Sequence, residues 1–223
     1  MGFVGKVRTL IDNRHFPLWG LLGSAVGLLF ILGAQIGYEG NYGEPFSMFN
    51  HYVSELGQLG VSHLAILFNG GLMLAGFFFT PFMIGLGLYL ENAIGKLAGL
   101  VGVYSSISII LVGIFPMNYS AEHGFWAMSF FLSGLVMTAL WAIAIIVQKQ
   151  PKIPKSFSLG GFINVAIFAM FLYGPWEGFT LATRPEFSWR VTLEWAIYFA
   201  IVGYLLSLAI YVRKKETRII VVD

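Results

Sequence analysis

The stretch FPLWGLLGSAVGLLFILGAQIGY, residues 16–38, decides the fold class of this 223-residue chain. It contains no charged side chain, and it exceeds the roughly 20 helical residues that cross a bilayer core of about 30 Å. The segment before it is short and basic, and no small-residue cleavage site follows it. We therefore interpret the stretch as a first membrane span and not as a cleaved signal peptide.

The rest of the chain is equally apolar. Hydrophobic residues make up 57% of it and charged residues 11%, with a mean hydropathy of +0.78, whereas soluble domains carry about 25% charged residues. Lipid permits only helices or closed barrels, and strand patterns are weak here. The sequence predicts an all-α bundle of six membrane helices in a single domain, residues 1–223, with spans at about 16–38, 64–90, 96–115, 124–147, 159–181 and 191–212.

Basic residues predict the orientation of the bundle, because they concentrate on the cytoplasmic side. Only Arg184 and Arg190 fall on the other side. The remaining 11 of the 13 are Lys6, Arg8, Arg14, Lys96, Lys149, Lys152, Lys155, Arg213, Lys214, Lys215 and Arg218. We expect a protein of the cell membrane with both termini in the cytoplasm.

The longest segment between predicted spans includes FNHYVSELGQLGVSHL, residues 49–64. Plotted at 100° per residue, its polar and apolar residues separate cleanly. One side holds Ser47, Asn50, His51, Ser54, Glu55 and Gln58, and the other holds Met48, Phe49, Tyr52, Val53, Leu56 and Leu59. This pattern predicts an amphipathic helix at about 46–60 that lies on the outer face of the cell membrane.

Other polar residues are expected at the same level of the bundle. Charged side chains within spans usually face the interior or an aqueous cavity, so Glu177 and Glu194 should point inward and pair with Arg184 or Arg190. Together with the surface helix, which would cover them, the polar residues at this level predict a ligand-binding pocket. Its expected lining is Asn50, Ser54, Glu55, Asn69, Glu122, His123, Glu177 and Glu194.

Metal and cofactor chemistry receives little support from the sequence. The chain has no cysteine, which excludes thiolate nucleophiles and cysteine-ligated metals. His51, His63 and His123 are expected on one side, but their spacing matches no metal-binding motif. We predict no metal site and no cofactor, and we retain Glu55 and His123 as candidate general acid or base.

Three stretches, NHYVSELGQLG at 50–60, LFNGGLMLAG at 67–76 and GIFPMNYSAEHGFWAMSFF at 113–131, carry a family resemblance. The chain resembles the six-helix prokaryotic membrane family catalogued as domain of unknown function 998. The residues that fit its pattern are Asn50, Ser54, Glu55, Gly57, Phe68, Asn69, Gly113, Pro116 and His123. The resemblance covers the first two-thirds of the chain, and Glu55 stands where the family more often has aspartate. A more distant similarity, to DRAM- and Frag-type six-helix membrane proteins, is an analogy of fold alone.

The resemblance implies a fold but no chemistry, so several functions stay open. The favoured hypothesis is an outer-leaflet pocket that binds or processes a lipid or other amphiphile. The polar loop residues could instead only fix the surface helix onto the bundle. A membrane-embedded hydrolase, with or without a metal, a subunit of a larger membrane complex and a transporter are also compatible with the sequence. The expected partners are membrane lipids and a second copy or another membrane protein, without nucleic acid.

Overall fold

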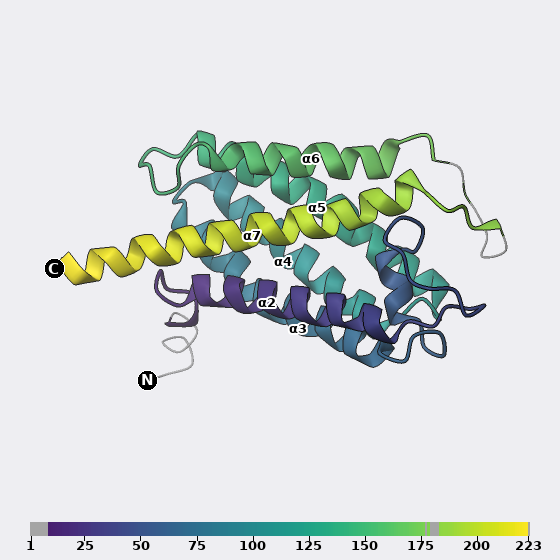
Figure 1. The fold of residues 1–223 in the computed structure, drawn as a ribbon. Helices are drawn as coiled ribbons and strands as arrows, with labels where there is room; N and C mark the ends of the chain where they lie inside the picture. Colours follow the sequence, from purple (N-terminus) through teal and green to yellow (C-terminus); the bar gives the residue numbers. More distant parts are fainter. Residues whose placement is uncertain (1–8, 177, 179–182, 223) are drawn as a thin grey trace.

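The computed structural model describes residues 9–176, 178 and 183–222, and its long helices run along a common axis (Figure 1). A short 3-10 helix, η1 (Gln35–Gly37), extends the first long helix, and a second, η2 (Val53–Gly57), lies in the loop that follows. The long helices are α2 (Phe16–Ala34), α3 (Ala65–Tyr89), α4 (Ala93–Ile114), α5 (Ser120–Ile146), α6 (Phe157–Tyr173) and α7 (Trp189–Val222). Within the described ranges, β-structure is limited to an isolated bridge between Tyr38 and Ser62.

The six helices form a closed ring. Each helix packs against the next one in the chain, and α7 packs back against α2. The first residues of α2 and the last of α7 lie at the same end, which we call the terminal end (Figure 1). The opposite, loop end carries the connections 38–64 and 115–119 together with the described residues between α6 and α7, namely 174–176, 178 and 183–188. The all-α six-helix fold predicted from hydropathy is confirmed.

Two helices differ in length from the predicted spans. Helix α6 ends at Tyr173, where Gly174 takes an extended conformation and Pro175 follows, because proline after a C-cap stops a helix. Its predicted continuation to 181 was therefore wrong for residues 174–176, and Glu177 and 179–182 lie outside the described residues. Helix α7 continues to Val222 instead of ending at 212, and it projects beyond the bundle at the terminal end (Figure 1).

The connection between α2 and α3 corrects a prediction. Only Val53–Gly57 is helical, as a single stretch of 3-10 helix, in place of a surface helix over about 46–60. The expected separation of polar and apolar residues holds only in part, since Val53 and Leu56 are buried as predicted, but Glu55 is 2% exposed and Phe49 is 56% exposed. The amphipathic pattern predicts a helix only if every polar side chain faces water, but the carboxylate of Glu55 is hydrogen-bonded to groups inside the protein.

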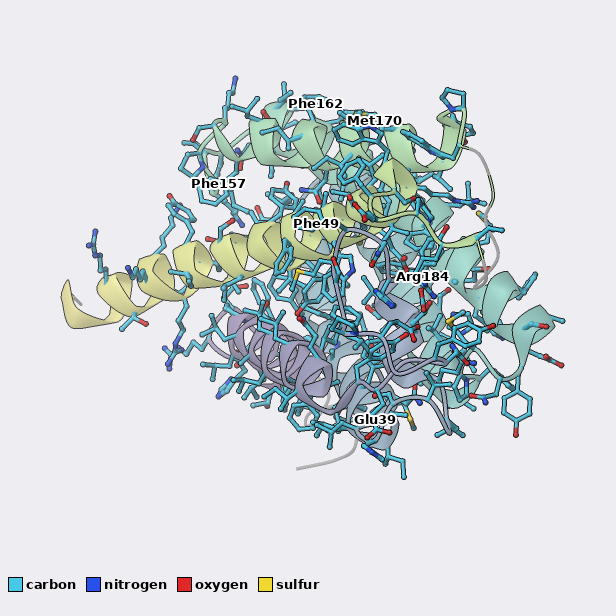
Figure 2. The ribbon with its side chains drawn as sticks, turned by 45° about the vertical axis from the view of Figure 1, so that its right-hand side comes forward. Glu39, Phe49, Phe157, Phe162, Met170 and Arg184 are labelled. Carbon is cyan, nitrogen blue, oxygen red and sulfur yellow. The ribbon has the colours of Figure 1, made fainter. Side chains whose placement is uncertain are left out.

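The outer surface of the bundle is apolar. Large side chains such as Phe162 and Met170 of α6 are exposed on it (Figure 2). Five helices are long and apolar enough to cross a membrane, and α6 is a shorter apolar helix. An apolar exterior on a ring of apolar helices is what a lipid environment requires, so the chain is a multi-pass membrane protein.

Candidate functional site

An ion pair at the loop end of the ring joins η2 to the segment before α7. Glu55 of η2 accepts hydrogen bonds from Arg184 at both carboxylate oxygens, at 3.0 Å from Nη1 and 2.7 Å from Nη2. The backbone N–H of Tyr52 donates to the same carboxylate at 2.8 Å, and the hydroxyl of Tyr38 donates at 3.2 Å. The two charged side chains are only 3% and 9% exposed, so this bidentate pair is buried and each carboxylate oxygen has two donors.

Further hydrogen bonds join the same two loops. Asn50 donates from its side-chain amide to the carbonyl of Pro185 at 3.1 Å, and its own carbonyl accepts from Arg184. The N–H of Ser188 donates to the carbonyl of Phe49 at 2.8 Å. We call segment 47–60, held in this way by 184–188, the cover. Figure 2 turns this end forward and shows where Arg184 and Phe49 lie in it.

The cover is also attached to the helices beneath it. Asn69 of α3 donates from its side-chain amide to the carbonyl of Gly57 at 2.9 Å. Trp195 of α7 donates from its indole N–H to the carbonyl of His51 at 2.9 Å. Asn118, between α4 and α5, exchanges two hydrogen bonds with the backbone of Leu59. The loop thus behaves as a fixed part of the bundle.

Burial sets the ionisation of the cover. It lowers the pKa of His51, and the positive charge of Arg184 lowers that pKa further, so the imidazole is neutral at pH 7. Burial would also lower the pKa of the Arg184 guanidinium, but the hydrogen bonds and the charge of Glu55 raise it above its ordinary value. Burial and the charge of Glu55 raise the pKa of the Tyr38 phenol, which keeps its hydroxyl a donor.

A cavity of about 110 Å³ lies beneath the cover, inside the ring of helices. Helices α2, α3, α4, α5 and α7 contribute to its wall together with η2. The wall is mainly aliphatic and aromatic, for example Ile31, Leu72, Phe79 and Val202. Apolar cavities of about 150 Å³ in other proteins stay dry and bind small apolar molecules such as benzene, so this one has room for a short hydrocarbon segment.

Three polar side chains line the cavity at the loop end. They are Ser54 of η2, His123 in the first turn of α5 and Glu194 in the second turn of α7. His123 and Glu194 are 8% and 9% exposed. Glu194 accepts one hydrogen bond from the described residues, donated by the N–H of Val53 at 3.3 Å. We call these three residues the cavity mouth.

The tautomer of His123 follows from its partner. Its Nδ1 lies 2.8 Å from the carbonyl oxygen of Phe115, and a carbonyl only accepts, so Nδ1 carries the proton. In the neutral ring Nε2 is then an acceptor, and it has no hydrogen-bond partner among the described residues. Ser54 likewise makes no side-chain hydrogen bond to the described part of the chain.

The predicted site residues thus fall into separate groups. Ser54, His123 and Glu194 line the cavity, whereas Asn50, Glu55 and Asn69 hold the cover in place. Glu122 is exposed to the outside, and Glu177 lies outside the described residues. Arg184 pairs with Glu55 in place of Glu194, and the described residues show no ion pair between Arg190 and Glu194. The predicted pairing with Glu177 lies outside the described residues.

The histidines of the loop end do not converge. His51 lies 3.7 Å from Glu44, whereas His63 forms an exposed pair with Glu39 at 2.7 Å. His123 is engaged with the backbone of Phe115. Across residues 9–176, 178 and 183–222, no three histidine or acidic side chains gather in a metal-binding arrangement.

The sequence interpretation missed Arg184 as the partner of Glu55, and it also missed Tyr38, Trp195 and Asn118. One signal was available for Arg184. Only two basic residues were predicted at this end, and a buried carboxylate in the connection between α2 and α3 would need one of them. The aromatic and amide donors gave no such signal, because no local sequence pattern shows which backbone carbonyl or carboxylate each of them contacts.

The ring of helices, the cover and the cavity together define a multi-pass helical membrane protein with an internal cavity capped at one end. The family model described as Protein of unknown function (DUF998) matches residues 21–211, and the chain belongs to that family. The match extends through α6 and most of α7, beyond the two-thirds expected from the motifs. No curated protein and no solved structure is significantly similar.

Proposed function

We propose that this protein binds a membrane amphiphile, with part of its hydrocarbon chain in the central cavity and its polar end at the cavity mouth. The observation that supports this most directly is the combination of an apolar wall with polar Ser54, His123 and Glu194 at one end. A hydrocarbon in this space would contact apolar side chains on all sides. Its polar end would meet hydrogen-bonding groups that the described residues leave available.

Gly27 of α2 provides a test with little risk to the fold. It is buried and lines the cavity, and a Cβ added there would meet nothing within 4 Å. Leucine at this position would fill the cavity and improve the helix propensity. The hydrogen bond from Tyr198 to Gly27 uses the backbone carbonyl, which the substitution retains.

The experiment compares lipids that co-purify with the wild type, with Gly27→Leu and with Gly203→Leu. Gly203 of α7 is the matched control, because it is exposed and a Cβ there also meets nothing within 4 Å. We expect mass spectrometry to detect a species that Gly27→Leu loses and Gly203→Leu retains, with unchanged melting temperatures. Identical lipid profiles for all three proteins would contradict the proposal.

We also propose that the loop end faces the outside of the cell membrane and that both termini lie in the cytoplasm. The concentration of lysine and arginine at the terminal end supports this orientation. The chain contains no cysteine, so a single cysteine can be introduced without background. A membrane-impermeant maleimide applied to intact cells should label Tyr119→Cys at the loop end and spare Lys214→Cys on α7. The reverse pattern would overturn the orientation.

A further inference from the structure

We infer that the ligand's polar end is a hydrogen-bond donor without negative charge, a hydroxyl or an amine, and that carboxylates and phosphates are excluded. This inference rests on the proposed amphiphile binding and assigns the chemical class of the polar end. It follows from the groups that Ser54, His123 and Glu194 present to the cavity.

The cavity mouth is rich in acceptors. His123 offers Nε2 as an acceptor, because its Nδ1 proton is used by the carbonyl of Phe115 at 2.8 Å. Glu194 holds one hydrogen bond, from Val53 to Oε2, which leaves Oε1 for a ligand. Ser54 can either donate or accept. A hydroxyl or an ammonium group satisfies such a set, whereas a carboxylate has no proton to give it.

The charges near the mouth also disfavour an anion. The Arg184 guanidinium is directed at Glu55, with both Nη atoms bonded to that carboxylate. Arg190 lies one turn before Glu194 on α7, and its guanidinium carbon is 5.8 Å from the centre of the Phe171 ring. Neither arginine lines the cavity. A carboxylate at the mouth would thus meet the acidic side chain of Glu194, whereas Arg190, whose charge acts on Glu194, lies outside the cavity lining.

The polar groups deeper in the cavity do not provide a site for an anion either. The Ser106 hydroxyl donates to the carbonyl of Gly102 at 2.9 Å, and the Tyr198 hydroxyl donates to the carbonyl of Gly27 at 3.0 Å. Both hydroxyl protons are therefore used within the protein. Ser105 adds one more hydroxyl to the wall of the cavity. A cationic side chain that could receive an anion is absent from the cavity lining among the described residues.

The test uses three probes with the same ten-carbon chain, namely 1-decanol, decylamine and decanoate. Each is added at equal mole fraction to the purified protein in micelles at pH 8, and the melting temperature is measured. A ligand that binds the folded state raises this temperature by mass action. The same measurement is made on Gly27→Leu. The part of the melting-temperature shift that is present in the wild type and absent in Gly27→Leu comes from the cavity, because effects on the micelle are the same for both proteins.

We expect decanol and decylamine to give a shift that Gly27→Leu removes, and decanoate to give none. Glu194→Gln should reduce the shift with decylamine more than the shift with decanol. Native mass spectrometry of the wild type needs no variant, and it should detect retained decanol or decylamine but no decanoate. A cavity-dependent shift with decanoate equal to that with decanol would overturn the inference and leave amphiphile binding intact. No cavity-dependent shift with any probe, together with unchanged co-purified lipids, would overturn the proposed function itself.

Discussion

Glu55 and Glu194 are buried acidic side chains at the loop end of the bundle, and they differ in how fully their hydrogen-bonding capacity is used. Glu55 accepts from Arg184, Tyr38 and the backbone of Tyr52. Within the described part of the chain, Glu194 accepts only from the backbone of Val53. Buried polar groups in folded proteins are normally satisfied, so the full set around Glu55 indicates a structural role. The incomplete set around Glu194 is what the proposed ligand site requires.

The largest effect should come from breaking the cover. Arg184→Met would leave the Glu55 carboxylate buried without its partner, and removing one member of a buried pair typically costs about 3–5 kcal/mol. We expect a large fall in the melting temperature of the purified protein.

The exposed pair of His63 and Glu39 is the matched control for Arg184→Met, since its side chains are 69% and 65% exposed. Such pairs contribute about 0–1 kcal/mol, so Glu39→Ala should leave the melting temperature nearly unchanged. Equal losses in Arg184→Met and Glu39→Ala would remove the structural distinction between Glu55 and an ordinary surface acid.

A smaller loss is expected from Gly57→Ala in the cover. A Cβ at this position would collide with the side-chain oxygen of Asn69 and lie 2.6 Å from the ring of Phe68. Overpacking of this kind costs about 1–3 kcal/mol, and thermal unfolding would measure it. Gly70→Ala is the control, because a Cβ there meets nothing within 4 Å. A cover that is only loosely attached would accept both substitutions equally.

The stability of the cover should also depend modestly on pH, because His51 titrates. Its folded-state pKa is lowered by burial and by Arg184, despite the opposing charge of Glu55 and its contacts with Ser47 and Glu44. The unfolded chain therefore takes up a proton first. The contribution of His51 to stability is present above about pH 6.5 and is lost as the pH falls below that value.

The melting temperature of the wild type should therefore decline more between pH 7.5 and pH 5 than that of His51→Gln. The two proteins are compared in the same detergent, so that other titrating groups contribute equally to both. An equal decline of the melting temperature in the two proteins would mean that protonation of the His51 imidazole does not destabilise the fold.

The smallest effect is expected at Glu122, which is exposed on α5 beside the mouth residue His123. Glu122→Gln should alter neither the melting temperature nor the co-purified lipids, whereas Glu194→Gln should alter the lipids. A changed lipid profile in Glu122→Gln would extend the ligand site beyond the cavity mouth.

Hydropathy predicted most of this fold, because burial in lipid leaves a strong signal in each span separately. Helix α3, predicted at about 64–90, runs from Ala65 to Tyr89. The cover could not be predicted in the same way. Its conformation depends on Glu55 and Arg184, which are 129 residues apart, and no local periodicity records such a pair. The cavity depends on how α7 closes the ring against α2, which is also a property of the assembled bundle.

The separation of Glu55 and Arg184 has a consequence for the order of synthesis. Glu55 leaves the ribosome before α3, α4, α5 and α6 are made, and its counter-ion follows only after all four. Until then the loop after α2 carries an uncompensated negative charge, and the ring lacks the helix that closes it. A nascent chain that stalls before residue 184 thus differs from the finished protein in local charge as well as in length. The connection before α7 thus supplies the counter-ion for the first loop, and α7 itself completes the bundle.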